Sequence, residues 1–109
     1  MKKSEQIKIN EQVLGVYKEV YNIIRYADEI EWKRLRTCQA RVTLIGKFSV
    51  LQSYDTVIAV IDNTTDTLYD FLRYVYGYTS TSAQHIAKFN HDYCNGSWCC
   101  TNRLTYREV

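Results

Sequence analysis

Apolar residues in the first third of the chain recur every three or four positions, which is the period of an amphipathic helix. Asn10 precedes this stripe as an expected N-cap, and Glu11 follows where a carboxylate complements the helix dipole. Basic side chains close to Arg36 suit the carbonyl groups at a helix C-terminus. The pattern predicts one long helix over residues 11–36, and residues 26–28 are where so long a segment would break.

The pattern then changes to short β-branched runs that predict strands. Residues 41–45 and 47–51 alternate on either side of Gly46, which is consistent with two strands. Residues 56–61 (TVIAVI) form a nearly continuous apolar run, which predicts a central strand covered on both faces. After a polar turn, residues 67–71 return as the hairpin partner.

A Ser/Thr-rich corner after Gly77 predicts the start of a second helix, with Thr79 or Ser80 as its cap. Apolar residues at helical spacing give this helix one buried face: Ile86, Phe89 and Tyr93. Residues 98–106 then form an expected edge strand or packed tail. The order of elements predicts a single α+β domain over residues 1–109, with a long N-terminal helix, a small antiparallel sheet of three to four strands, and a second helix packed on that sheet.

Composition agrees with a folded domain, because 46% of the 109 residues are hydrophobic. The charged N-terminus has no apolar run behind it, and no stretch approaches the roughly 18 apolar residues of a membrane span. We therefore expect a cytoplasmic protein without membrane contact, with its four cysteines reduced. The ten tyrosines are expected mainly to line strands, where aromatic residues are enriched.

The charges are unevenly placed although the formal net charge is only +2. A basic stretch precedes an acidic one, and a solvated mixed surface is favoured over a dedicated binding face for both. If they do contact a partner, the candidate basic residues are Lys33, Arg34 and Arg36. The candidate acidic residues around the predicted hairpin are Asp62, Asp66 and Asp70, whose carboxylates could oppose a basic channel.

Metal binding and catalysis have weak candidates. A metal-like cluster consists of His91, Cys94, Cys99 and Cys100, but its spacing is irregular for zinc, and reduced thiols without a cofactor are favoured. His85 could be imagined in a hydrolase triad with a serine and Asp55. No nucleophile-elbow motif supports that idea, so we expect no enzyme and give His85 a structural bond to a loop carbonyl or to Tyr54.

The start of the second helix is also a candidate anion site, because backbone amides and hydroxyl groups gather there. Its candidate residues are Thr79, Ser80, Thr81 and Ser82. No glycine-rich phosphate loop accompanies them, so self-capping of the helix is favoured over phosphate binding.

Two sequence blocks resemble a family of small, largely uncharacterised proteins encoded by phages and mobile elements of Gram-positive bacteria. The first block, L-x-S-Y-[DN]-T-x-[VI]-A, matches Leu51, Ser53, Tyr54, Asp55, Thr56 and Ala59. The second block, G-Y-S-x-T-[TS]-x-x-H-I-x-x-F, matches Gly77, Tyr78, Thr81, Ser82, His85, Ile86 and Phe89, with Thr79 in place of the usual serine. The family-like unit spans residues 42–94, and the resemblance implies no particular activity.

In size and implied phage origin the chain is also similar to anti-CRISPR proteins that inhibit type II-A systems. This similarity implies a non-enzymatic inhibitor that binds the CRISPR nuclease or its guide-RNA complex. The sequence leaves open whether the protein is a monomer or a homodimer. Two alternatives stay open. One is a nucleic-acid-binding phage accessory protein that uses the basic residues. The other is a nucleotide-binding sponge that uses the Ser/Thr corner.

Overall fold

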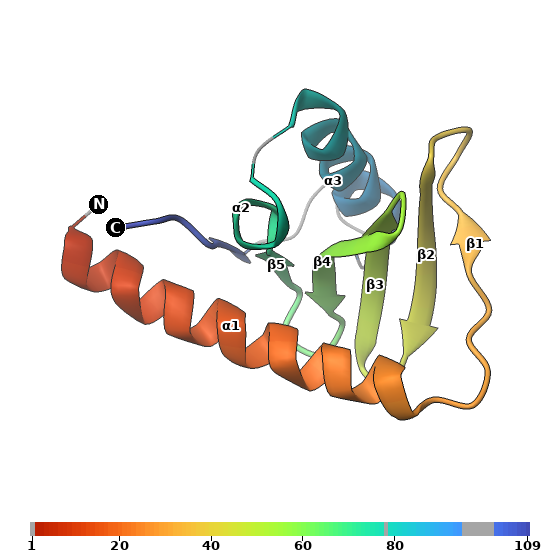
Figure 1. The fold of residues 1–109 in the computed structure, drawn as a ribbon, viewed down its shortest axis with the longest axis horizontal. Coiled ribbons are helices and arrows are strands. Elements are labelled where there is room, and N and C mark those ends of the chain that lie inside the picture. The colour runs from red at the N-terminus through yellow and green to blue at the C-terminus, as the bar shows by residue number, and fades with distance from the viewer. Residues whose placement is uncertain (1, 78, 95–101) are drawn as a thin grey trace.

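A six-stranded sheet forms the middle layer of the protein, and the long helices α1 and α3 lie on its opposite faces (Figure 1). The computed structural model describes residues 2–77, 79–94 and 102–109. The helices are α1 (Lys3–Tyr26), α2 (Leu72–Val75) and α3 (Ser80–Tyr93). The strands are β1 (Lys33–Arg34), β2 (Ala40–Ile45), β3 (Phe48–Ser53), β4 (Thr56–Asp62), β5 (Thr67–Asp70) and β6 (Asn102–Thr105).

The strands follow one another across the sheet in the order β1-β2-β3-β4-β5-β6. Neighbouring strands are antiparallel except β5 and β6, which are parallel. The predicted α+β class and the packing of a second helix on the sheet are confirmed. The predicted count of three to four strands is wrong, because β1 forms where a helix was expected and β6 adds a parallel edge strand from the C-terminal tail.

The first helix differs from its predicted bounds at both ends. It begins at Lys3 and ends at Tyr26, which lies at the break that the sequence predicts. Residues beyond the break cannot continue the helix, because Leu35 is buried in the core under α3 while Val13 and Val20 of α1 are buried on the other face. The chain must therefore leave the helix and pass around the sheet edge.

Asn10 is not the N-cap of α1. It lies inside the helix, and its side-chain amide donates to the carbonyl of Arg107 (2.6 Å) and accepts from the Arg107 backbone N–H (3.0 Å). One turn earlier, Gln6 donates to the carbonyl of Thr105 (3.0 Å) and to the Asn10 side chain (2.8 Å). The two amides thus attach the segment that ends β6 to the first helix.

The central strand β4 is buried on both faces, as its apolar run predicts. A bulge shifts its register against β3, so that Leu51 pairs with Ala59 while Gln52 pairs with Val57. Ile58 is the extra residue, and it lies in the core under α3 together with Ala59. The bulge therefore explains why the side chains of β4 do not alternate strictly between the two cores.

The tyrosines do not mainly line strands, and that prediction is wrong. Tyr69 is the tyrosine that lies in a described strand. Tyr74 instead meets Tyr17 of α1 edge to face at 5.4 Å between ring centroids, and Tyr106 at 5.2 Å. Edge-to-face contacts suit aromatic rings because the positive edge of one meets the negative face of the other.

Among the helices of the described residues, none combines the length and the hydropathy that a membrane-spanning segment requires.

Candidate functional site

The three predicted acidic residues are engaged within the protein. The carboxylate of Asp62 is buried and accepts bonds from the Thr64 backbone N–H (2.9 Å) and hydroxyl (2.6 Å). Burial acts to raise the pKa of Asp62, but the bonds from Thr64 and the nearby charge of Lys47 outweigh it and hold the pKa below its ordinary value. This carboxylate stabilises the turn between β4 and β5.

Asp70 and Asp66 also bind other parts of the fold. Asp70 is buried, accepts from the Leu72 backbone N–H at the start of α2 (3.0 Å) and pairs with Arg103 of β6 (3.0 Å). Asp66 accepts a bond from the thiol of Cys94 (3.0 Å). The geometry therefore gives these carboxylates structural partners, and their contact with another molecule stays a prediction.

Two of the three predicted basic residues stabilise the β1–β2 region. Arg36 makes a two-pronged pair with Asp92 at the end of α3, with N···O distances of 2.8 and 2.7 Å. The bond from Arg36 lowers the pKa of the Asp92 carboxyl to about 2, which outweighs the opposing effect of burial. Arg34 donates to the carbonyls of Thr37 (3.3 Å) and Cys38 (3.0 Å).

The predicted self-capping of the second helix is confirmed. Thr79 is the N-cap, and its hydroxyl accepts from the Ser82 backbone N–H (3.2 Å). Ser82 is buried beneath the corner, whereas Ser80 and Thr81 are exposed. The hydroxyl of Thr79 thus has a partner in the fold, and anion binding by this corner stays a prediction.

The metal-like residues are not brought together where the structure describes them. Nδ1 of the exposed His91 lies 3.0 Å from Oδ1 of Asp92. The thiol of Cys94 is instead buried and faces Asp66. Cys99 and Cys100 lie outside the described residues. Within residues 2–77, 79–94 and 102–109, no three His, Cys, Asp or Glu residues form a group that could hold a metal ion.

A buried polar network joins the two motif blocks. The Ser53 hydroxyl lies 2.8 Å from Nδ1 of His85 and 3.3 Å from the hydroxyl of Ser82, which in turn lies 2.7 Å from that of Tyr76. Ser53 is fully buried, so its hydroxyl has no access to a substrate. The predicted hydrogen-bond partners of His85, a loop carbonyl or Tyr54, are wrong, because its Nδ1 bonds to Ser53. Tyr54 is nevertheless a neighbour of His85, with 6.1 Å between the ring centroids. The network instead connects strand β3 to helix α3.

We expect His85 to make stability depend on pH. Burial lowers the pKa of His85 below its ordinary value, and the positive charge of Lys88 adds to this effect. The folded state therefore favours the neutral imidazole. The stability that His85 contributes is fully present above a pH of about 6.5, and it is lost as the pH falls through the lower pKa of the folded state. Urea unfolding at about pH 7 and about pH 5 should show a smaller loss for His85→Gln than for the unchanged protein. Equal losses would contradict this role.

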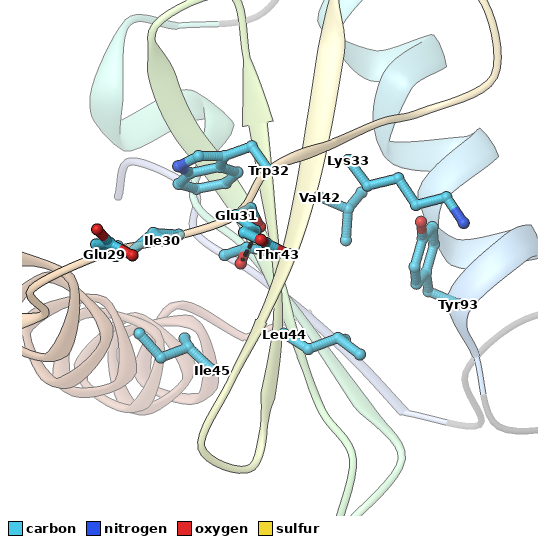
Figure 2. Close-up of a pocket in the computed structure, with 10 residues that line it drawn as sticks. All are labelled: Glu29, Ile30, Glu31, Trp32, Lys33, Val42, Thr43, Leu44, Ile45 and Tyr93. Carbon is cyan, nitrogen blue, oxygen red and sulfur yellow. Dashed lines mark hydrogen bonds between the residues drawn. The ribbon is translucent and has the colours of Figure 1, made fainter.

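An open groove lies along the outer edge of β2, and Figure 2 shows the side chains that line it. This edge groove has a volume of about 640 Å³. It is bounded by residues 29–33 of the connection from α1 to β1, by residues 42–45 of β2, and by Tyr93 of α3. In Figure 2, Trp32 and Ile45 lie on the α1 side of the strand, while Leu44 points to the side of Tyr93.

The groove exists because β1 is shorter than β2. β1 pairs only with Arg41 and Val42, so in the described part of the chain the end of β2 has β3 on its inner side but no strand on its outer side. The Thr43 hydroxyl donates to the Glu31 carbonyl (2.8 Å) and holds the preceding segment to one side. Leu44 is consequently 70% exposed, which is unusual for a leucine in a strand.

A second hollow of about 260 Å³ adjoins the edge groove at Trp32. Tyr17 and Tyr21 of α1 line this hollow, and Asp55 of the β3–β4 turn lies at it. Trp32 therefore stands between two concave surfaces, in a setting where large aromatic side chains commonly contribute most to protein binding.

Sequence reasoning missed the edge groove because it placed residues 29–36 in a helix. A usable signal was present at Leu44. In a strand, alternation places this apolar residue on the face opposite to Thr43 and Ile45. Comparison of the chain with models of known protein families, with curated proteins and with solved structures finds no match.

Proposed function

We propose that this protein is a phage-derived, non-enzymatic inhibitor of host defence that binds a type II-A CRISPR nuclease. The resemblance of the two motif blocks to phage and mobile-element proteins supports the origin. The similarity to anti-CRISPR proteins supports the target. The observation that carries the binding role is the edge groove, where Leu44 and Trp32 present apolar surface beside charged side chains.

The proposed contact surface combines apolar and charged groups. Leu44 is exposed in the groove, and the side chains of Glu29, Glu31 and Lys33 line the same groove. Such a combination is typical of protein interfaces, which contain both apolar and polar groups. In this proposal Glu29 and Glu31 oppose basic residues of the nuclease, because Asp62 and Asp70 are already engaged in the fold.

A cleavage assay tests the proposal. The nuclease is loaded with guide RNA, mixed with increasing amounts of the protein and then given target DNA. We expect cleavage to stop at about one protein per nuclease, as for stoichiometric binding with a Kd below the assay concentration. Full cleavage at large molar excess would contradict the proposal. Binding of the protein to free DNA or RNA, with a steep salt dependence, would instead favour the nucleic-acid-binding alternative.

A matched pair of variants places the contact surface. Leu44→Glu introduces a charge in the edge groove and is expected to weaken inhibition by about tenfold or more. Ile7→Glu makes the same kind of change at an exposed apolar residue near the N-terminus of α1, and should inhibit like the unchanged protein. Equal inhibition by both variants would show that the nuclease contacts the protein outside the groove.

A further inference from the structure

We propose that the edge groove binds an extended segment of the partner polypeptide, which adds a strand to the sheet beside Leu44. The inference deepens the proposed function, on which it rests for the identity of the partner. Strand addition uses the backbone groups of an exposed sheet edge for affinity and the alternating side chains for specificity. Four features of the protein support it.

The first feature is the direction of the Leu44 backbone groups. The pair Ile45 and Phe48 closes a two-residue hairpin at Gly46, whose φ of +57° suits the first position of a type II′ turn. In such a hairpin the closing pair is hydrogen-bonded, and the pairs alternate from there along the strands. The N–H and C=O of Leu44 therefore point away from β3, toward the groove.

The first residues of β2 show the same alternation of backbone directions. Ala40 has the same parity as Leu44, and its carbonyl accepts from the Leu35 backbone N–H (2.8 Å) on the outer side. Val42, which also has this parity, lies opposite Lys33 of β1. The outward groups of Ala40 and Val42 thus face a neighbouring segment, and Leu44 is where that neighbour stops.

The second feature is the shape of the groove around this edge. The segment that carries Glu31 and Trp32 lies on the α1 side, where Thr43 holds it, and Tyr93 lies on the α3 side (Figure 2). The strand edge is left between these two walls. An extended chain entering there meets backbone partners at its centre and a side-chain surface on each face.

The third feature is the contrast with the other edge of the sheet. At β6 the side chains of Gln6 and Asn10 occupy the carbonyl of Thr105 and both backbone groups of Arg107. Proteins commonly cover sheet edges because an open edge recruits other strands. Here α1 covers the β6 end, whereas the end of β2 has an exposed leucine and no covering element in the described part of the chain.

The fourth feature is the charge on the walls, which defines the chemistry of the segment. Glu29 and Glu31 place two exposed carboxylates on the α1 side, while Leu44 and Tyr93 place apolar surface on the other. The ammonium group of Lys33 lies beside Tyr93 and disfavours a second cation on that side (Figure 2). Alternate residues of an extended chain face opposite sides. The segment that fits therefore carries basic side chains alternating with apolar ones.

A peptide titration followed by NMR tests the inference without the nuclease. The probe is acetyl-Thr-Val-Lys-Val-Lys-Val-Thr-amide, added to the full chain labelled with ¹⁵N. We expect the amide signals of Leu44 and its neighbours to shift, and hydrogen exchange at the Leu44 N–H to slow by about tenfold. The matched control is the same peptide N-methylated at its three central residues, which keeps the side chains but removes backbone donors. It should bind at least about tenfold more weakly.

Two variants separate the backbone of Leu44 from its side chain. Leu44→Pro removes the outward N–H together with the leucine side chain, a change that an edge position can accept, and should abolish the peptide-induced shifts. Leu44→Thr keeps that N–H and should retain them. Circular dichroism and thermal unfolding verify that each variant is folded. If Leu44→Pro does not fold, the N-methylated peptide still decides the question.

Several results would overturn the inference. They are the absence of shifts at millimolar peptide, equal binding of the two peptides, or shifts that map away from residues 42–45. Protection of Leu44 that grows with protein concentration, without peptide, would assign the edge to a second copy of the chain instead. If the protein inhibits the nuclease and Leu44→Pro inhibits equally, strand addition is wrong and the proposed function stands. If the peptide binds at Leu44 but the nuclease is not inhibited, only the proposed function fails.

Discussion

Replacing Phe89 with alanine is expected to lower the free energy of unfolding by about 3–5 kcal/mol. Phe89 is fully buried where α3 packs on the sheet, and its ring lies 5.6 Å from that of Tyr93. The substitution removes the ring from the core and leaves a cavity that the surrounding strands can fill only partly. Because a domain of this size is stable by about 5–15 kcal/mol, the loss is a large part of the total.

Urea unfolding, followed by circular dichroism, measures this loss. The matched control is Gln84→Ala on the same helix, where the side chain is exposed and the expected change is within about 0.5 kcal/mol. A loss below about 1 kcal/mol for Phe89→Ala would mean that α3 is not held on the sheet by this residue.

Replacing Asn10 with alanine is expected to destabilise the protein by about 1–3 kcal/mol, because it leaves part-buried backbone groups of Arg107 without their partner. An N-cap residue would cost a comparable amount, so the size of the loss does not separate the two roles. The location of the effect does. Loss of the Asn10 amide should speed hydrogen exchange in residues 102–107, far along the chain from α1.

Hydrogen exchange measured by NMR on the full chain gives this readout. Glu11→Ala is the control, since Glu11 is adjacent in sequence but exposed. It should leave exchange in residues 102–107 unchanged. If Asn10→Ala speeds exchange only in the first turns of α1, the attachment of the C-terminal segment to α1 depends on other contacts.

Part of the fold could be predicted because it depends on residues that are close in sequence. The hairpin of β2 and β3 follows from alternation around Gly46, whose positive φ suits glycine. The cap at Thr79 follows from the preference of a hydroxyl for the free N–H groups of a helix start. The two-sided burial of β4 follows from its continuous apolar run.

The end of the first helix shows where such reasoning fails. Apolar spacing continues through Ile30, and the basic residues that follow suit a helix end. The same basic residues serve another purpose in the fold, because Arg36 pairs with Asp92 of α3 and Arg34 binds the β1–β2 turn. A helical period cannot reveal that Leu35 is buried on the face of the sheet opposite α1.

The candidate sites were harder to predict than the fold, because they combine distant residues. The acidic residues appear as one cluster in the sequence, yet Asp70 pairs with Arg103 of β6 and Asp66 binds Cys94 after α3. The Ser53–His85 bond unites two motif blocks that can be seen in the sequence, but neither block alone indicates the contact. Ser53 and His85 are both buried, so the two blocks occur together because they form one contact in the core.

The sequence by itself determined the α+β class, the central strand, the first hairpin and the capped second helix, since local periodicity and turn chemistry specify them. Only the tertiary structure decided the extent of α1, the role of Asn10, the partner of His85 and the open edge at Leu44. Each of these depends on which segments meet across the sheet. That choice is made by burial and backbone pairing between residues far apart in the chain, to which a local pattern is blind.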